Sequence, residues 1–288
     1  MTIEHDIFDL IKRNAQQEER IRAAILNGSR ACKSVKKDPF QDFDVIYLTS
    51  DLQFFIDNHD WIDCFGERII LEMPWYKDFE PEEYGGQFNY QMLLKNGFRI
   101  DLTFASLDRA DFVVKNDPVG AVLLDKDGLI NESLFADESI YLVKPPTRRK
   151  FENCCNSFWW VLQNVAKGIR RAELPYAMTM LHFTREELHR VISWHIGLMN
   201  EFSVSSGKMG KYFEKHLDDN HWRMYQKTYP SADYDSMWQA VSEACHLFRE
   251  LSIEIADGLS FEYPHADDKA MTAYLEGVRY SPENVQNA

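Results

Sequence analysis

The feature that most constrains this chain is a Gly-Ser pair followed by two aspartates that alternate with apolar residues. The pair is Gly28-Ser29, and after a spacer of twelve residues the chain reads Asp-Phe-Asp-Val at 42–45. The apolar run at 21–26 predicts a strand before the glycine, and the alternation predicts a second strand after the spacer. Side chains alternate in a strand, so Asp42 and Asp44 are expected on one face, about 7 Å apart.

These residue types in this order suit a bound nucleoside triphosphate. A glycine lets the backbone come close to a ligand, and we expect Gly28 and Ser29 to hold the β- and γ-phosphates through amides and a hydroxyl. Arg30 is expected to clamp the leaving pyrophosphate. Asp42 and Asp44 are expected to bind Mg²⁺, which would carry ATP, because carboxylates and phosphates are the ligands this ion prefers. The stretch therefore predicts nucleotidyl transfer.

A third acid fits the same site. Asn96-Gly97 predicts a hairpin that joins a strand at 87–94 to a strand at 98–104, and the second strand carries Asp101. A lone strand aspartate is usually a solvated or edge charge, but two further acids behind the Gly-Ser pair favour a functional one. Asp101 is expected either to share a second metal ion or to accept the proton of the attacking hydroxyl. The sequence leaves these two roles open.

The arrangement of predicted elements indicates an α+β fold with two domains. Strands and helices mix up to Pro145-Pro146, and beyond it every pattern is helical. We predict a catalytic nucleotidyltransferase domain at 1–145, with a mixed sheet and flanking helices, and a substrate-binding helical bundle at 146–288. Substrates are expected in a cleft between the domains. An acidic segment at 78–83 could face a polycation at the mouth of the cleft, although we favour a solvated loop, and the tail from Ser281 is interpreted as loose.

Capping signals locate the helices of the predicted bundle. Thr147 is expected to cap a long helix that ends near Arg171. Pro175 fits the first turn of the next helix. Thr184 and Glu187 have the spacing of a capping box, which predicts that another helix begins there.

Charge and cysteine content limit the partners and the compartment. The net charge is −14, and residues 1–145 hold 16 Lys and Arg against 27 Asp and Glu. Phosphate backbones attract basic surfaces, so we expect no nucleic-acid partner; a cationic acceptor suits the field better, although acidity also serves plain solubility. No apolar run predicts a membrane span or a secretory signal, and five cysteines without metal spacing fit reduced thiols. We expect a cytoplasmic monomer.

The motif resembles that of polymerase-beta-like nucleotidyltransferases, because the Gly-Ser pair, the Asp-apolar-Asp stretch and the later acid match in order. Over nearly the whole chain the sequence resembles the aminoglycoside 6-adenylyltransferases. The resemblance runs through residues 28–30, 40–44, 65–69, 99–103, 123–127, 146–148, 154–156, 158–159, 167–168 and 194–196. It implies transfer of AMP from Mg-ATP to the 6-hydroxyl of streptomycin, with release of pyrophosphate and resistance to the drug.

Several interpretations stay open at this point. The resemblance implies a phosphate contact for Lys167, while a solvated helix lysine explains it equally well. Trp159, Tyr176 and Trp194 are either core residues or stacking partners for a substrate, and their helical spacing favours core. The acceptor could instead be a lincosamide or a protein hydroxyl. A nonenzymatic nucleotide-binding or antitoxin-like module is a further alternative, which the three intact acids argue against.

Overall fold

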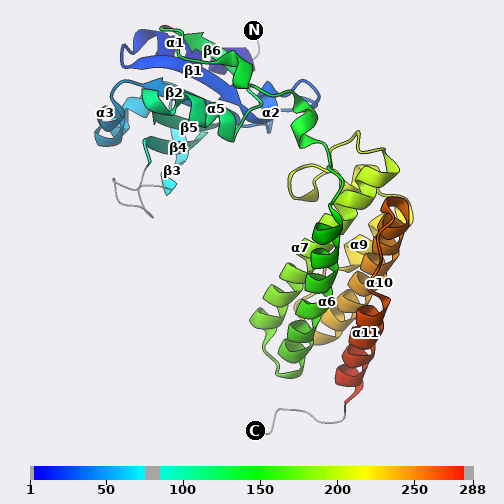
Figure 1. The fold of residues 1–288 in the computed structure, drawn as a ribbon. Coiled ribbons are helices and arrows are strands. Elements are labelled where there is room, and N and C mark those ends of the chain that lie inside the picture. The colour runs from blue at the N-terminus through cyan, green and yellow to red at the C-terminus, as the bar shows by residue number, and fades with distance from the viewer. Residues whose placement is uncertain (1–2, 75–84, 282–288) are drawn as a thin grey trace. The chain divides into compact units, whose positions relative to one another are not determined.

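A computed structural model describes residues 3–74 and 85–281, with side chains from residue 7 onward. The predicted acidic loop at 78–83 and the tail beyond Ser281 lie outside these residues. The chain divides into two compact units, Met1–Ile140 and Tyr141–Ala288 (Figure 1). The boundary predicted between 145 and 146 falls slightly further along the chain. A mixed sheet with helices followed by a helical region confirms the predicted fold class.

The first unit is built on one sheet of six strands in the order β3-β4-β5-β2-β1-β6. Its described elements are α1 (Ile3–Gln17), β1 (Ile21–Asn27), α2 (Gly28–Ala31), β2 (Phe43–Thr49), α3 (Leu52–Asp57), η1 (His59–Phe65), β3 (Arg68–Glu72), β4 (Gln87–Leu94), β5 (Arg99–Ser106), η3 (Leu107–Arg109), α5 (Ala110–Asn116), β6 (Ala121–Asp125), η4 (Glu132–Leu134) and η5 (Glu138–Tyr141), the last of which crosses the unit boundary. The strands β2 and β5 pair in parallel, and the other neighbouring pairs are antiparallel.

Two apolar clusters cover the two faces of the sheet and determine where the acids point. Phe43, Val45 and Tyr47 of β2 are fully buried against the side that carries α1, α3 and η1. Leu48 of β2 and Val113 of α5 belong to the cluster on the opposite face. Because strand side chains alternate, the even-numbered residues of β2 face α5. Asp44, which lies between Phe43 and Val45, therefore points to the α5 side of the sheet from a central strand.

The second unit is a helical bundle (Figure 1). Its elements are α6 (Arg148–Arg170), α7 (Leu174–Met199), η6 (Lys208–Gly210), α8 (Phe213–His216), α9 (Asp219–Lys227), α10 (Tyr234–Leu259) and α11 (His265–Tyr280). The Thr147 side chain accepts a hydrogen bond from the Lys150 amide, which confirms the predicted cap of α6. Phe158 and Phe248 stack with ring centroids 3.7 Å apart in the core between α6 and α10. Across the described residues, none of the helices has the length and apolarity that a membrane crossing requires.

The predicted capping box at Thr184 is wrong. The helix α7 runs unbroken from Leu174 to Met199, and Pro175 sits in its first turn as expected. Thr184 is fully buried, and its hydroxyl donates to the carbonyl of Met180 one turn earlier. A threonine whose hydroxyl is satisfied this way is compatible with a helix interior. The local spacing matched a cap, but the apolar face on both sides of Thr184 continues the helix through it.

Candidate active site

The three predicted acids come together at the centre of the sheet in the first unit. In the parallel pairing of β2 with β5, Asp44 lies directly beside Asp101. Asp42 immediately precedes β2, and its side chain is 39% exposed against 18% for Asp101. The Arg99 guanidinium donates to both carboxylate oxygens of Asp101, from Nε at 2.7 Å and Nη2 at 2.6 Å. Its Nη1 lies 3.6 Å from Asp42 Oδ2, so one cation bridges two of the three acids.

Burial and mutual repulsion raise the pKa values of Asp42 and Asp44. Burial raises the pKa of Asp44 to about 6, helped by the negative charges of Asp101, Asp42 and Asp117 and opposed by Arg99. Burial also raises the pKa of Asp42, where Arg99 opposes the rise and Asp101 adds to it. Carboxylates that disfavour one another in a partly buried site form a strong ligand set for a divalent cation. The donor set and its charge therefore fit the expected Mg²⁺.

Gly28 brings the backbone close to the Asp44 carboxylate. Its φ is +68°, a conformation that favours glycine. A Cβ built on it would lie 1.9 Å from Asp44 Oδ2, well inside any permitted contact. The residues after the strand form the one-turn helix α2 rather than the simple turn expected from the Gly-Ser pair. The phosphate contacts predicted for Gly28 and Ser29 remain predictions, and Gly28 is required by its proximity to Asp44.

Arg30 is built into the protein interior next to the acids. It is only 5% exposed, and its guanidinium carbon lies 3.8 Å from the centroid of the Phe43 ring. Its Nη2 donates to the Gln41 carbonyl at 2.7 Å, and its Nε donates to the Asp42 carbonyl at 3.1 Å. Arg30 therefore holds the backbone that presents Asp42, a positioning role that the sequence did not indicate. The pyrophosphate contact stays a prediction.

Lys167 lies on α6 in the second unit, whereas the acids lie in the first unit. Its Nζ donates to Gln163 Oε1 at 2.7 Å, one turn earlier on α6. That contact is typical of a solvated helix face. The phosphate contact expected for Lys167 stays a prediction.

A cavity of about 250 Å³ opens beside the acids within the first unit. Its lining consists of Asn27, Asp44, Val45, Ile46, Gln87, Asn89, Asp101, Thr103, Phe112, Val113, Asn116 and Asp117. Asn27 is 3% exposed, and its Nδ2 donates to the Asp117 carbonyl while its Oδ1 has no protein partner. The Oδ1 of Asn89 is also buried without a partner. With acids and orphan amide oxygens around it, this cavity suits a ligand rich in hydrogen-bond donors.

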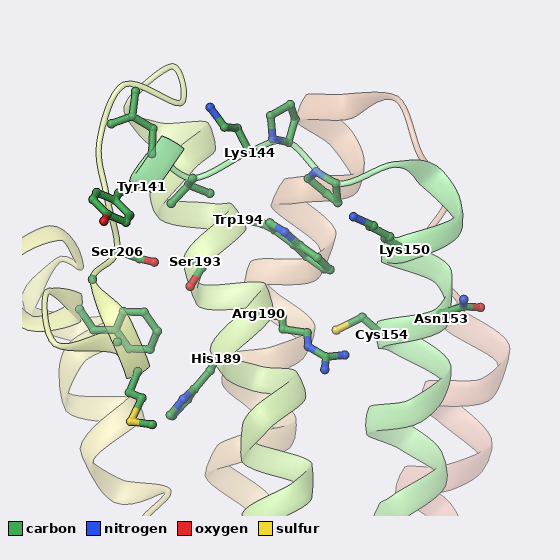
Figure 2. A pocket seen from close by; sticks show the side chains of 18 of the residues that line it. Tyr141, Lys144, Lys150, Asn153, Cys154, His189, Arg190, Ser193, Trp194 and Ser206 are labelled. Carbon is green, nitrogen blue, oxygen red and sulfur yellow. The ribbon is translucent and has the colours of Figure 1, made fainter. Parts of the chain in front are cut away.

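A larger cavity of about 730 Å³ lies within the helical unit, lined by α6, α7, the segment 141–146 before α6 and residues between 206 and 213 (Figure 2). Lys144, Lys150 and Arg190 contribute cations to its wall, and Trp194 lies along it. Burial, with nearby Arg185, lowers the pKa of His189 to about 4, so this ring is neutral at physiological pH. The wall is therefore basic and aromatic, in contrast to the acidic cavity of the first unit.

The three aromatic candidates have different environments. Trp159 is 2% exposed and belongs to the bundle core, as its spacing favoured. Trp194 is partly buried, packs against that core and also lines the larger cavity. Tyr176 is 41% exposed near the start of α7. Of the three, Trp194 is the one placed to touch a ligand in the larger cavity.

Acids on neighbouring central strands, with a Gly-Ser pair packed against them, are typical of the nucleotidyltransferase class. A family model described as streptomycin adenylyltransferase matches residues 1–278. The chain is 35% identical over 280 residues to an aminoglycoside 6-adenylyltransferase of Bacillus subtilis (strain 168), covering 96% of this chain and 98% of the relative. It is also 35% identical over 270 residues to an aminoglycoside 6-adenylyltransferase of Campylobacter jejuni, covering 93% of each.

The crystal structure of an aminoglycoside 6-adenyltransferase from Bacillus subtilis is similar over 98% of this chain and 100% of its own, at 33% identity and a TM-score of 0.48. The family match and the sequence relatives place the chain plainly: it belongs to the streptomycin adenylyltransferase family and is an enzyme, a nucleotidyltransferase. The resemblance predicted from the motifs is confirmed.

Replacing Gly28 tests how closely the backbone must approach Asp44. Gly28→Ala should displace the Asp44 carboxylate and greatly weaken Mg²⁺ binding, because its Cβ would overlap Oδ2 at 1.9 Å. Gly128→Ala is the matched control, since Gly128 has nearly the same φ, +67°, with open space around it. Calorimetric titration measures the Mg²⁺ affinity of both variants, and thermal unfolding measures any loss of stability caused by a Cβ at positive φ. Equal Mg²⁺ affinity in the two variants would contradict this account.

The raised pKa of Asp44 predicts a pH-dependent cost in the metal-free protein. The folded-state pKa, about 6, exceeds the ordinary value of 3.8, so this group's contribution to stability is present below pH 4 and lost as pH rises through 6. Asp44→Asn should therefore stabilise the metal-free protein at pH 8, by on the order of 1–3 kcal/mol, and have little effect at pH 4. Scanning calorimetry in EDTA measures this. Asp111→Asn, at an exposed site on α5, is the control, and parallel pH profiles for both variants would refute the assignment.

Proposed function

We propose that this enzyme transfers AMP from Mg-ATP to the 6-hydroxyl of streptomycin, releases pyrophosphate and so confers resistance to the drug. The observation that carries the proposal is the juxtaposition of Asp42, Asp44 and Asp101 with Gly28, in a chain whose relatives are named aminoglycoside 6-adenylyltransferases. Mg²⁺ held by these carboxylates would neutralise the charge on the phosphate oxygens.

The proposed reaction is a single displacement at the α-phosphorus. The acceptor oxygen forms a bond to phosphorus, and the bond from phosphorus to the oxygen that bridges to the β-phosphate breaks. Pyrophosphate leaves with the electron pair of the broken bond. The hydroxyl proton passes to a carboxylate of the site or to water, and Asp101 is one candidate because it borders the cavity. Arg30, through its bonds to the backbone at Gln41 and Asp42, keeps the first acid in place.

We assign the acceptor to the cavity beside the acids. Streptomycin carries guanidinium groups and many hydroxyls, which are hydrogen-bond donors. The unpartnered oxygens of Asn27 and Asn89 are acceptors that match those donors, and the acidic wall of the cavity matches the positive charge of the drug. A lincosamide offers one amine and fewer hydrogen-bond donors than streptomycin, so the lining favours the aminoglycoside.

The larger cavity suits an anionic substrate. Lys144 and Lys150 place positive charge on its wall, which would repel a polycationic drug and attract an anion, while the third basic residue, Arg190, pairs with Glu187 at 2.9 Å. We therefore propose that the helical unit, from residue 146 to 288, binds substrate through an anionic group, with residues up to about 145 forming the catalytic domain. ATP is a cytoplasmic substrate, so we propose that the enzyme acts in the cytoplasm. We also propose that it acts as a monomer, without nucleic acid or a membrane.

The direct test measures pyrophosphate release from ATP and Mg²⁺, with and without streptomycin, followed by mass analysis of the drug. We expect drug-dependent release, an added AMP on streptomycin, and modification at the 6-hydroxyl. Release with a lincosamide or a protein, but not with streptomycin, would keep the transfer site and refute the acceptor. Binding of ATP without pyrophosphate release for any of these acceptors would refute the proposed transfer reaction.

The acids provide a mutational test. Asp42→Asn or Asp44→Asn should leave the fold intact and reduce transfer by about a thousandfold or more, because losing a charged ligand removes several kcal/mol of electrostatic stabilisation. Asp111→Asn serves as the control, because its side chain is 61% exposed on α5 and lies outside the cavity lining. Transfer is measured as the initial rate of pyrophosphate release at saturating Mg²⁺. Near-wild-type rates in either acid variant would refute the site.

Asn89 tests the acceptor assignment separately. Asn89→Leu removes the unpartnered oxygen from the cavity, together with the Nδ2 donations to the Leu102 carbonyl and Thr103 Oγ1, so it should raise KM for the drug by about tenfold. KM for ATP should change little. Gln53→Leu, on the exposed surface of α3, is the control. An equal rise in both KM values would mean that Asn89 supports the fold of the site generally and would contradict a role in acceptor binding.

A further inference from the structure

A second cluster of potential metal ligands lies in the helical unit. One ligand atom each of His221 on α9, Glu250 and Glu254 on α10 lies within 4.8 Å of the others. Spaced four residues apart, the two glutamates project from one face of α10. On α7, His195 places Nε2 2.8 Å from Glu254 Oε2, and its ring centroid lies 5.3 Å from that of His221. Three helices therefore converge on two imidazoles and two carboxylates.

His221 has an unusual environment for a histidine buried in a bundle. The residue is 7% exposed, and neither ring nitrogen has an aligned hydrogen-bond partner. Asp218, which caps α9, also places Oδ2 2.6 Å from Nδ1, close enough for an ion pair with the ring. Glu250 Oε1 is 3.5 Å from Nε2, which is buried without an aligned partner. Buried polar atoms are normally paired, so an Nε2 that faces a carboxylate without bonding it points to a missing shared partner.

We propose that His221, Glu250 and Glu254, with His195 as the fourth ligand, bind a divalent transition metal of the Zn²⁺ class. Imidazole nitrogens with carboxylate oxygens suit Zn²⁺, whereas Mg²⁺ prefers oxygen and water alone. A tetrahedral site with bonds of about 2.1 Å needs ligand atoms roughly 3.4 Å apart, so the ligand atoms of His221, Glu250 and Glu254 must approach one another and the 2.8 Å contact between His195 and Glu254 must lengthen. The side chains of Glu250 and Glu254 are 47% and 43% exposed, which leaves them free to move and opens a route for the ion.

The metal would act as a cross-link in the helical unit. Its ligands come from α7, α9 and α10, so binding would join the short helix α9 to the two longest helices of the unit. An ion that binds only the folded state stabilises it by mass action. This inference is independent of adenylyl transfer, because the cluster lies in the unit that does not contain the catalytic acids. The spacing of His189 and His195 predicts no metal site for that pair, and His189 instead bonds Tyr225.

The test is titration of the full-length, EDTA-treated protein with Zn²⁺ in the presence of millimolar Mg²⁺, which keeps the carboxylate site of the first unit occupied. We expect one equivalent of Zn²⁺ to bind by calorimetry and to raise Tm by several degrees. Co²⁺ in place of Zn²⁺ should give the intense visible absorption of a tetrahedral site. Absence of both Zn²⁺ binding and a Tm increase would overturn the proposal.

Variants locate the ion. His221→Gln and Glu250→Gln should each weaken Zn²⁺ binding by about tenfold or more, since even outer-sphere partners of a metal contribute that much. Glu250→Gln guards against misfolding, because its side chain is largely exposed. The matched control is His182→Gln, which removes an exposed His–Glu pair on α7 with Nε2 3.5 Å from Glu186. Equal Zn²⁺ affinity in all three variants would place the ion elsewhere and refute the site.

Discussion

The buried core of the first unit holds like charges together at the centre of its sheet, against their mutual repulsion. The parallel pairing of β2 with β5 sets Asp44 beside Asp101, while the apolar face of the same strands is fully buried. A sheet register cannot slip by one residue without exposing that apolar face, so the acids have no route to separate. The hydrophobic core thus holds together carboxylates that would otherwise move apart, and the raised pKa of Asp44 reflects the cost.

Neighbouring residues reduce this cost in ways that also shape the site. Arg99 places a guanidinium across Asp101 and Asp42. The Arg30 guanidinium donates to backbone carbonyls and lies over the face of the Phe43 ring. These contacts hold the segment that carries Asp42 in place. Gly28 contributes by lacking a side chain, because any Cβ there would collide with Asp44. Charge, hydrogen bonding and close packing therefore all serve one arrangement of carboxylates.

Local patterns predicted most of the fold, because alternation and capping act between near neighbours. The strand at 43–49, the hairpin that delivers Asp101 and the cap at Thr147 follow from such patterns. The features that the sequence did not predict depend on contacts between residues distant in sequence. Thr184 is buried inside α7 by packing against other helices and caps nothing, and the ring of His221 lies near glutamates from another helix.

The candidate site was predictable only in part for the same reason. The order of Gly28 and the acids along the chain indicated their chemistry, whereas the orphan oxygen of Asn27 exists because the sheet buries it beside Asp44. The inward role of Arg30 likewise depends on the fold of the loop before β2. Residue type suggested what the acids bind, and tertiary burial determined how strongly their charges interact.

The most direct measurement of this account is the number of protons released when Mg²⁺ binds the metal-free protein. Titration calorimetry in buffers of different ionisation enthalpy gives that number at each pH. With the pKa of Asp44 at about 6, binding at pH 6 should release about half a proton from this group, and binding at pH 8 almost none. Asp44→Asn should abolish the release at pH 6. Mg²⁺ binding at pH 6 without proton release would contradict the claim that repelling, partly buried acids form the metal site.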